Sequence, residues 1–243
     1  MMTATHAFPG FSPDALKFLK QLKRHNDREW FVPRKAVYEE VLLAPMRAFV
    51  EEMDVRFASF APEIIGNPKR SIFRLYRDTR FSKDKTPYKT HIACWFQHRR
   101  ASHGVGSETH GAGAGYYFHL EPGASLVAGG IWMPPRESVA AIRERIALQP
   151  TELARLVSAR TFRERFGALN SEHRLTRVPR GYATDHPAGE WLRYASFTTS
   201  ARLTDEDVCS PTLARIVEKD YQKLLPMVRW LNSALGYPPD ESR

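Results

Sequence analysis

The sequence predicts an α+β fold: a single domain in which helices from the N- and C-terminal parts of the chain pack on one face of an antiparallel meander sheet. Two observations support this class. Short runs rich in aromatic and β-branched residues follow one another between residues 71 and 133. Apolar stripes with helical spacing precede and follow these runs. No internal repeat or linker divides the chain, so residues 1–243 are expected to form one domain.

Helices are expected before the strands. A first helix is predicted from Ser12 or Asp14 to about Leu22. A second is predicted to start at Asn26, because Asn26 and Glu29 have the spacing of a capping box. Two prolines are expected to break or restart it: Pro33 and Pro45. The apolar stripe beyond them predicts a helix packed on the sheet: Met46, Phe49, Val50, Met53 and Phe57.

The strands are predicted at residues 71–78, 90–98, 115–122 and 125–133. Most of the connections between them are too short for crossover helices, which indicates antiparallel pairing. The longest connection, residues 99–114, is rich in Gly, Ser and His and has no hydrophobic periodicity. We expect it to be a flexible hairpin loop.

The second half of the chain is predicted to return to helices. One helix follows Pro135, a second follows Pro150, and a third ends near Gly167. Residues 174–187 are expected to form a loop, and residues 194–203 a fifth strand. The last helix carries an apolar stripe typical of a core helix: Leu213, Ile216, Val217, Leu224, Val228, Leu231 and Leu235.

Most of the chain's excess charge lies in residues 69–89. The formal charge of the whole chain is +9, and eight basic residues against two acidic ones give this stretch +6. The basic residues are Lys69, Arg70, Arg74, Arg77, Arg80, Lys83, Lys85 and Lys89. Charge at this density repels itself unless an anion, an acidic side chain or water compensates it. The stretch is either a solvated hairpin end or an anion site, and its interleaved arginines and tyrosines favour an anion site.

Strand alternation predicts what the two faces of the sheet carry. The inward set, facing the helices, is predicted to be Phe73, Leu75, Ile92, Cys94, Phe96, Tyr116, Phe118 and Leu120. The opposite face then collects polar and aromatic side chains: Arg74, Tyr76, Asp78, His91, Trp95, Tyr117, His119 and Glu121. Each has an ordinary structural explanation, but together, beside the basic stretch, they indicate a ligand site.

No metal site or cofactor motif is predicted. The spacing of His98, His103 and His110 fits no standard ligand pattern, and no cysteine or carboxylate pair supports it. The glycines form neither a dinucleotide-binding nor a P-loop motif.

Composition limits the class of protein. A hydrophobic content of 42% and an aromatic content of 12% are typical of a globular chain. The first residues lack a signal-peptide pattern, and no apolar run is long enough to span a membrane. Two cysteines, Cys94 and Cys209, are too few for a disulfide framework, so a cytoplasmic location is expected.

The chain resembles a family of bacterial and fungal proteins known as domain of unknown function 2461. The resemblance rests on NDREWF at 26–31, RLYRDTRFSKDKTPYKTH at 74–91, GYYFHLEP at 115–122 and RVPRGYATDHP at 177–187. It covers nearly all of the chain, although the loop at 99–114 is longer than the family pattern. The resemblance implies no particular reaction, cofactor or catalytic residue.

The RVPRGYATDHP segment has two explanations. It is either a structural crossing loop, or a loop that folds over the sheet and closes the site with Arg180 and His186.

The sequence therefore predicts a protein that binds a phosphorylated or other anionic small molecule, with catalysis left open. The expected anion ligands are Arg74, Arg77, Arg80, Lys83, Lys85, Lys89, Tyr76, Tyr88, Tyr117, Arg180 and His186. The candidates for acid–base chemistry are His91, His119, Glu121 and Asp78. The alternatives are a nucleic-acid-binding module that uses the same basic loop and aromatic face, and a protein that binds an acidic partner.

Overall fold

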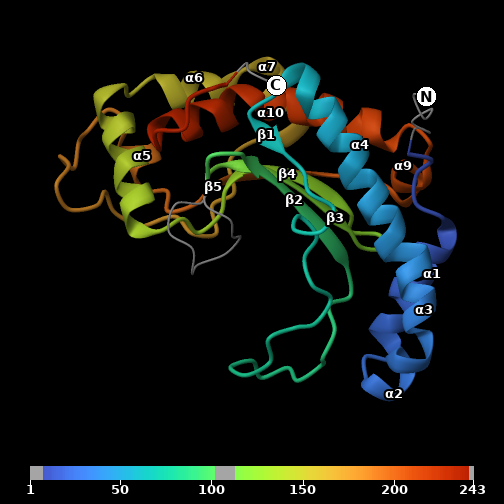
Figure 1. Ribbon diagram of the computed structural model, residues 1–243. Coiled ribbons are helices and arrows are strands. Elements are labelled where there is room, and N and C mark those ends of the chain that lie inside the picture. Colours follow the sequence, from blue (N-terminus) through green and yellow to red (C-terminus); the bar gives the residue numbers. More distant parts are fainter. Residues whose placement is uncertain (1–7, 102–112, 241–243) are drawn as a thin grey trace.

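The computed structural model describes residues 8–101 and 113–240 of the chain. Within these residues the strands form one antiparallel five-stranded sheet whose order follows the chain, as the meander prediction requires (Figure 1). The strands are β1 (Ile64–Ile65), β2 (Ile92–His98), β3 (Gly115–Leu120), β4 (Leu126–Ile131) and β5 (Phe197–Arg202). The α+β fold class is confirmed.

Helices precede the sheet and follow β4. Those before it are α1 (Pro13–Arg24), α2 (Arg28–Phe31), the 3₁₀ turn η1 (Val32–Arg34), α3 (Lys35–Tyr38), the π-helical turn η2 (Glu39–Leu43) and α4 (Ala44–Phe60). Those after β4 are α5 (Arg136–Leu148), α6 (Glu152–Ser158), α7 (Arg160–Phe166), α8 (Gly189–Leu192), α9 (Asp205–Cys209) and α10 (Leu213–Ala234). Among these, every helix falls short of the length or the apolar character that crossing a membrane requires.

The core lies between the sheet and two long helices. Helix α4 contacts β2, α10 contacts β4, and the two helices contact each other over the same face (Figure 1). Phe57 of α4 packs with its ring 5.3 Å from that of Tyr116 on β3 and 5.8 Å from that of Tyr221 on α10. Helices from both parts of the chain therefore bury the predicted inward face, because their apolar stripes and the alternating strand residues remove each other from water.

The prediction of a regular strand at residues 71–78 is wrong. The segment makes only isolated bridges, Ile72 with Cys94 and Tyr76 with Tyr88. Because β2 begins at Ile92, the residues after Phe73 extend beyond the end of that strand. They pair instead with residues 87–89, on the limb of the same loop that returns to β2. The edge of the sheet is instead β1, which the sequence analysis missed and which pairs with the far end of β2.

The bridge between Ile72 and Cys94 also corrects the predicted face of Phe73. Cys94 is buried on the helix side, so Ile72 shares that side and Phe73 faces the opposite way. The ring of Phe73 lies edge-on to Tyr117, with 5.9 Å between centroids. Leu75 is buried as predicted, since the chain turns between Phe73 and Leu75.

Two details of the N-terminal helices differ from the prediction. Asp27, not Asn26, is the N-cap of α2, and its side chain accepts a hydrogen bond from the backbone N–H of Trp30. The helical path does not break at Pro45 but passes through η2 into α4. A π-helical turn accommodates a proline because it changes the hydrogen-bond register of the backbone by one residue.

Candidate functional site

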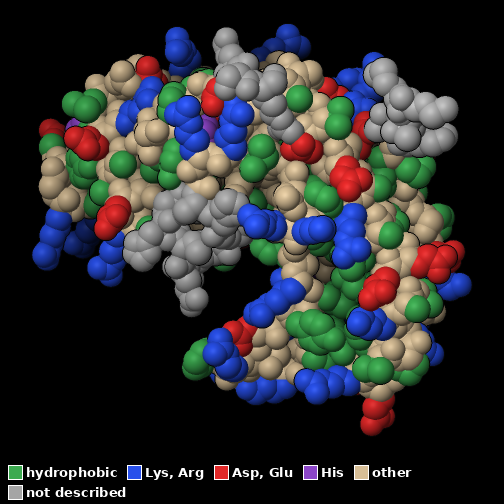
Figure 2. All heavy atoms as spheres, in the orientation of Figure 1, with side chains coloured by type: hydrophobic (Ala, Val, Ile, Leu, Met, Phe, Trp, Pro, Cys, Tyr) green, Lys and Arg blue, Asp and Glu red, His purple; other side chains and the backbone are tan. Residues whose placement is uncertain are grey.

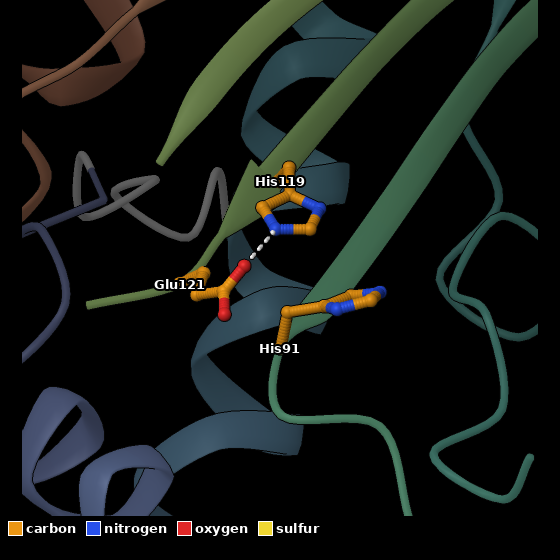
Figure 3. Close-up of side chains that lie close together, drawn as sticks. All are labelled: His91, His119 and Glu121. Atoms are coloured by element: carbon orange, nitrogen blue, oxygen red, sulfur yellow. Dashed lines mark hydrogen bonds and ion pairs between the residues drawn. The ribbon is translucent and has the colours of Figure 1, made fainter. Parts of the chain in front are cut away.

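Three titratable side chains meet where β2 begins and β3 ends (Figure 3). His119 and Glu121 are two residues apart at the end of β3, so their side chains leave the same face. Ile92 pairs with Leu120, which places His91 opposite Glu121 one step further along. The rings of His91 and His119 lie 4.1 Å apart between centroids. The sequence predicted each of these as an acid–base candidate, and the strand register brings them together.

Hydrogen bonds orient His119 and Glu121. The hydroxyl of Tyr117 lies 2.9 Å from Nδ1 of His119, and Nε2 of the same ring lies 3.1 Å from Oε2 of Glu121. Because an ionised carboxylate only accepts, Nε2 carries the hydrogen and Nδ1 accepts from the Tyr117 hydroxyl. The other carboxylate oxygen accepts from the Thr90 hydroxyl at 3.3 Å and lies 3.8 Å from Nζ of Lys23.

The surroundings determine the charge of each group. Burial, followed by the nearby His119 and Lys89, lowers the pKa of His91 to about 4. Burial also lowers the pKa of His119, against the opposing effect of Glu121. For Glu121, burial raises the pKa, but the hydrogen bond and the charges around it outweigh burial and the net pKa is lowered. At neutral pH the cluster therefore presents two neutral imidazoles beside an ionised carboxylate.

Several charges of the basic stretch are compensated within the stretch itself. Arg80 forms two short hydrogen bonds to Asp78, at 2.7 and 3.0 Å, and Arg77 binds Asp84 and the hydroxyl of Thr86. The bonds from Arg80 lower the pKa of Asp78 to about 2. The backbone N–H of Thr86, followed by Arg77, lowers that of Asp84 to about 2. Asp78, a predicted acid–base candidate, thus belongs to an ion pair in the loop and not to the histidine cluster.

Arg74 and Lys89 differ from these pairs. The backbone N–H of Lys89 donates to the carbonyl of Leu75 at 2.8 Å, so Arg74 and Lys89 lie on neighbouring limbs of the loop. Nζ of Lys89 lies 5.3 Å from the ring centre of Phe73, and burial, followed by the charge of Arg74, lowers the Lys89 pKa. Within residues 8–101 and 113–240, no carboxylate lies within ion-pair distance of either side chain. The Phe73 ring connects this pair to Tyr117 and hence to the histidine cluster.

The surface beside this segment is hollowed and basic. Figure 2 shows a hollow next to the arm that residues 66–91 form in Figure 1, with Lys and Arg side chains along its rim. A separate cleft of about 250 Å³ opens beside Glu121 and Thr90, against helix α1. Its lining includes the basic residues Lys20, Lys23 and Arg24. Glu121 of the cluster thus borders a cleft with a basic lining.

Other predicted anion ligands lie elsewhere on the arm. Tyr88 is buried, with its ring 4.3 Å from that of Phe31, and Tyr76 is about half exposed and packs on Tyr88. Lys83 is exposed, and Nζ of Lys85 donates to the carbonyl of Thr79 at 2.9 Å.

Arg180 and His186 do not join the cluster. Their segment bridges Arg174 to Tyr194 just before β5, whereas the basic arm runs along β2, and β3 and β4 lie between these two strands. His186 accepts a hydrogen bond from the backbone N–H of Ala188 at 3.0 Å and lines a cleft of its own of about 460 Å³. The loop at 174–187 therefore forms a separate surface feature and does not close over His91 and His119.

The histidines considered as metal ligands do not form a group in the described residues. His98 is buried at the end of β2, where its Nε2 lies 3.1 Å from the carbonyl of Pro238 and its ring packs on Tyr237. His103 and His110 belong to residues 102–112 of the predicted flexible loop, which lie outside the described residues.

Sequence reasoning missed the residues that support the site from a distance. Asn26 binds the backbone of Tyr88, and Lys23 of α1 reaches Glu121. The spacing of Asn26 and Glu29 predicts a helix cap at Asn26, whereas Asp27 is the N-cap in the structure. Nothing in the sequence pattern indicates contacts across more than sixty residues, so only the fold reveals them.

The comparisons with known proteins identify a family. A model of a conserved hypothetical protein family, DUF2461, matches residues 14–230, and the chain belongs to this family. Neither a curated protein nor a solved structure matches the chain.

Proposed function

We propose that this member of the DUF2461 family binds a phosphorylated or other anionic small molecule between Arg74 and Lys89, beside the cluster of His91 and His119. One observation carries the proposal: these two cations lie together without a carboxylate partner among the described residues, while neighbouring Arg77 and Arg80 each have one. Two like charges held together repel each other, and because Lys89 is partly buried, water compensates its charge less than at an exposed position. A bound phosphate group provides that compensation through charge-assisted hydrogen bonds.

The place of the pair favours a ligand that extends over the sheet. Phe73 and Tyr117 supply an apolar and aromatic surface between the cations and the imidazoles. A molecule held at one end by its anionic group would reach His91, His119 and Glu121 with the other. Neutral imidazoles beside a carboxylate are suited to general base chemistry, so catalysis on the bound anion is compatible with the site. The cytoplasm, where phosphorylated metabolites are abundant, is the proposed location.

A second candidate is single-stranded nucleic acid, and one observation favours it. Phe81 at the tip of the arm is 94% exposed, and Arg80 lies over its ring at 5.7 Å. An exposed aromatic ring among basic residues is a stacking platform of the kind that binds bases while cations bind phosphates. This mode uses the tip of the arm, whereas the small-molecule mode uses its base.

Ligand binding to three variants separates these two modes. Purified protein would be titrated by calorimetry with a panel of phosphate, sugar phosphates, nucleotides and short oligonucleotides. We expect Arg74→Ala and Lys89→Ala each to weaken binding of the best small anion, while Lys83→Ala, an equal change of charge on the same arm, leaves it unchanged. Equal losses in all three would show a general charge effect and contradict the site.

Salt dependence gives an independent measure. A small anion in a defined site binds one to one and raises the melting temperature of the protein. Single-stranded nucleic acid held through several phosphates shows a log–log salt slope of about −0.7 per phosphate contact. Loss of oligonucleotide binding in Phe81→Ala, with no thermal shift from any small anion, would favour the second candidate.

A further inference from the structure

The three side chains of the cluster are also a set of metal ligands. His91, His119 and Glu121 each present a ligand atom, and these atoms lie within 4.8 Å of one another. All three side chains are partly buried, and they leave adjoining strand ends toward the same space (Figure 3). We propose that His91, His119 and Glu121 bind one divalent transition-metal ion, of the class that two imidazoles and a carboxylate prefer. The ligands belong to the cluster and include neither Arg74 nor Lys89, so the test of the metal site is separate from that of the anion site.

The distances suit a first-row ion. In a tetrahedral site with metal–ligand bonds of about 2.0 Å, the ligand atoms lie about 3.3 Å apart. Nε2 of His119 and Oε2 of Glu121 already lie 3.1 Å apart. The His91 nitrogen has to move closer by no more than about 1.5 Å, which a rotation of its side chain supplies.

The residues around the ligands have the arrangement that metal sites need. The Tyr117 hydroxyl lies 2.9 Å from the second nitrogen of the His119 ring. Thr90 and Lys23 hold the second oxygen of Glu121. Outer partners of this kind fix the orientation of ligating imidazoles and carboxylates.

Metal binding requires one rearrangement of hydrogens. Without metal, Nε2 of His119 donates to Glu121 and Nδ1 accepts from Tyr117. With metal at Nε2, the ring hydrogen moves to Nδ1, which then donates to the Tyr117 oxygen, and the hydroxyl turns its own hydrogen away. The proton count of the ring does not change. Tyr117 is therefore a positioning residue, which donates a hydrogen bond to His119 without metal and accepts one from it with metal bound.

The ligand set also indicates the kind of site. Structural zinc sites use four protein ligands, whereas three ligands leave a position open for water or substrate. Two histidines and one carboxylate occur in catalytic zinc sites and in non-haem Fe(II) sites. We expect the ion at this cluster to keep an exchangeable position that faces the partly exposed side of the sheet.

The test uses the full chain without a histidine tag. A chelator removes any bound metal, and the chelator is then removed by dialysis. The protein would be incubated separately with Zn²⁺, Mn²⁺, Co²⁺ and, under anaerobic conditions, Fe²⁺. Metal retained after gel filtration would be measured by mass spectrometry, and affinity by calorimetry. The variants are His91→Ala, His119→Ala, Glu121→Gln and Tyr117→Phe. His173→Ala is the matched control, because His173 is an exposed histidine that packs on Trp132.

We expect one ion per chain in the wild type and in His173→Ala. Loss of a ligand in the first three variants should lower affinity at least about 100-fold, and Tyr117→Phe should lower it about 10-fold, the range found for outer partners. Circular dichroism would establish that each variant is folded. No retained ion in the wild type, or equal affinity in the wild type and His119→Ala, would overturn the proposal.

One measurement does not depend on the variants folding. Nitrogen NMR of the histidine rings in the wild type reports the tautomer of each imidazole. On addition of Zn²⁺, we expect the His119 signal to change from the form with hydrogen on Nε2 to the form with hydrogen on Nδ1. The His91 signal should shift at the same ratio of metal to protein. Unchanged signals for both rings at one equivalent of metal would refute the site.

Discussion

Asn26 binds both backbone groups of Tyr88, which lies 62 residues further along the chain. Its side-chain oxygen accepts from the N–H of Tyr88 at 3.0 Å, and its side-chain nitrogen donates to the carbonyl at 2.9 Å. The Tyr88 ring is buried against Phe31. The N-terminal helical region thereby fixes the returning limb of the basic arm next to Lys89. A single amide side chain thus connects the scaffold to the proposed anion site.

Replacement of this amide should destabilise the protein. Asn26→Ala leaves two partly buried backbone groups without a partner, which costs about 1–3 kcal/mol in the free energy of unfolding. Asn26→Asp should also destabilise the protein, because the carboxylate still accepts from the Tyr88 N–H but places an acceptor oxygen against the Tyr88 carbonyl. Urea unfolding of the three proteins measures both losses.

Asn170→Ala is the control for this series. Asn170 makes one side-chain hydrogen bond, to the Thr198 hydroxyl at 3.2 Å, in an exposed position. We expect Asn170→Ala to lower the free energy of unfolding clearly less than Asn26→Ala does. Equal losses in the two variants would contradict a special stabilising role of Asn26.

The carboxylates of the arm should titrate at low pH for different reasons. Side-chain hydrogen bonds from Arg80 are the largest cause of the lowered pKa of Asp78, whereas the backbone N–H of Thr86 is the largest cause for Asp84. In Arg80→Ala we expect the pKa of Asp78 to rise from about 2 toward its ordinary value of 3.8. In Arg77→Ala the pKa of Asp84 should stay closer to 2, and carbon NMR titration measures both.

The same shifts give the sign of the stability effect. A lowered folded pKa means that the contacts of each carboxylate stabilise the fold above pH 3.8, and that this contribution disappears as the pH falls through about 2. The Asp78 and Asp84 carboxylates are exposed, so solvent screens the pairs and we expect the melting temperature of Arg80→Ala at neutral pH to stay close to that of the wild type. A large loss of stability would instead make Arg80 part of the scaffold.

Removal of the Lys89 charge should stabilise the protein while weakening anion binding. Lys89 is partly buried and lies near the charge of Arg74, and both disfavour its charged form. Methionine keeps the length of the side chain and its contact with the Phe73 ring. For Lys89→Met we expect a gain of about 0.5–1 kcal/mol in the free energy of unfolding, at the low end of the range for single stabilising substitutions. For a chain of this size that is roughly 2 °C in melting temperature.

Lys83→Met, on the same arm but exposed, is the matched control and should change stability little. A loss of stability in Lys89→Met that exceeds the control would mean that the ammonium group has a stabilising partner, and would argue against an anion site at this position.

The sequence predicts most strands of the sheet. β2, β3, β4 and β5 alternate buried and partly exposed side chains along short runs, and short connections dictate their antiparallel order. The alternation also placed Tyr117, His119 and Glu121 on one face, since residues two apart on a strand share a side. The prediction of a strand at residues 71–78 was wrong because a turn interrupts the alternation there, and no residue pattern in the sequence indicates that turn.

What the sequence determined by itself is therefore local: the period of each strand and helix, the concentration of charge in residues 69–89, and the face of His119 and Glu121. The tertiary structure decided how these parts combine. It set His91 opposite Glu121, gave Arg77 and Arg80 their carboxylates, and left Arg74 and Lys89 together on neighbouring limbs. The physical reason is that periodicity follows from backbone geometry within a few residues. Pairing of charges depends instead on distances between side chains, which strand register and loop closure determine only in the folded chain.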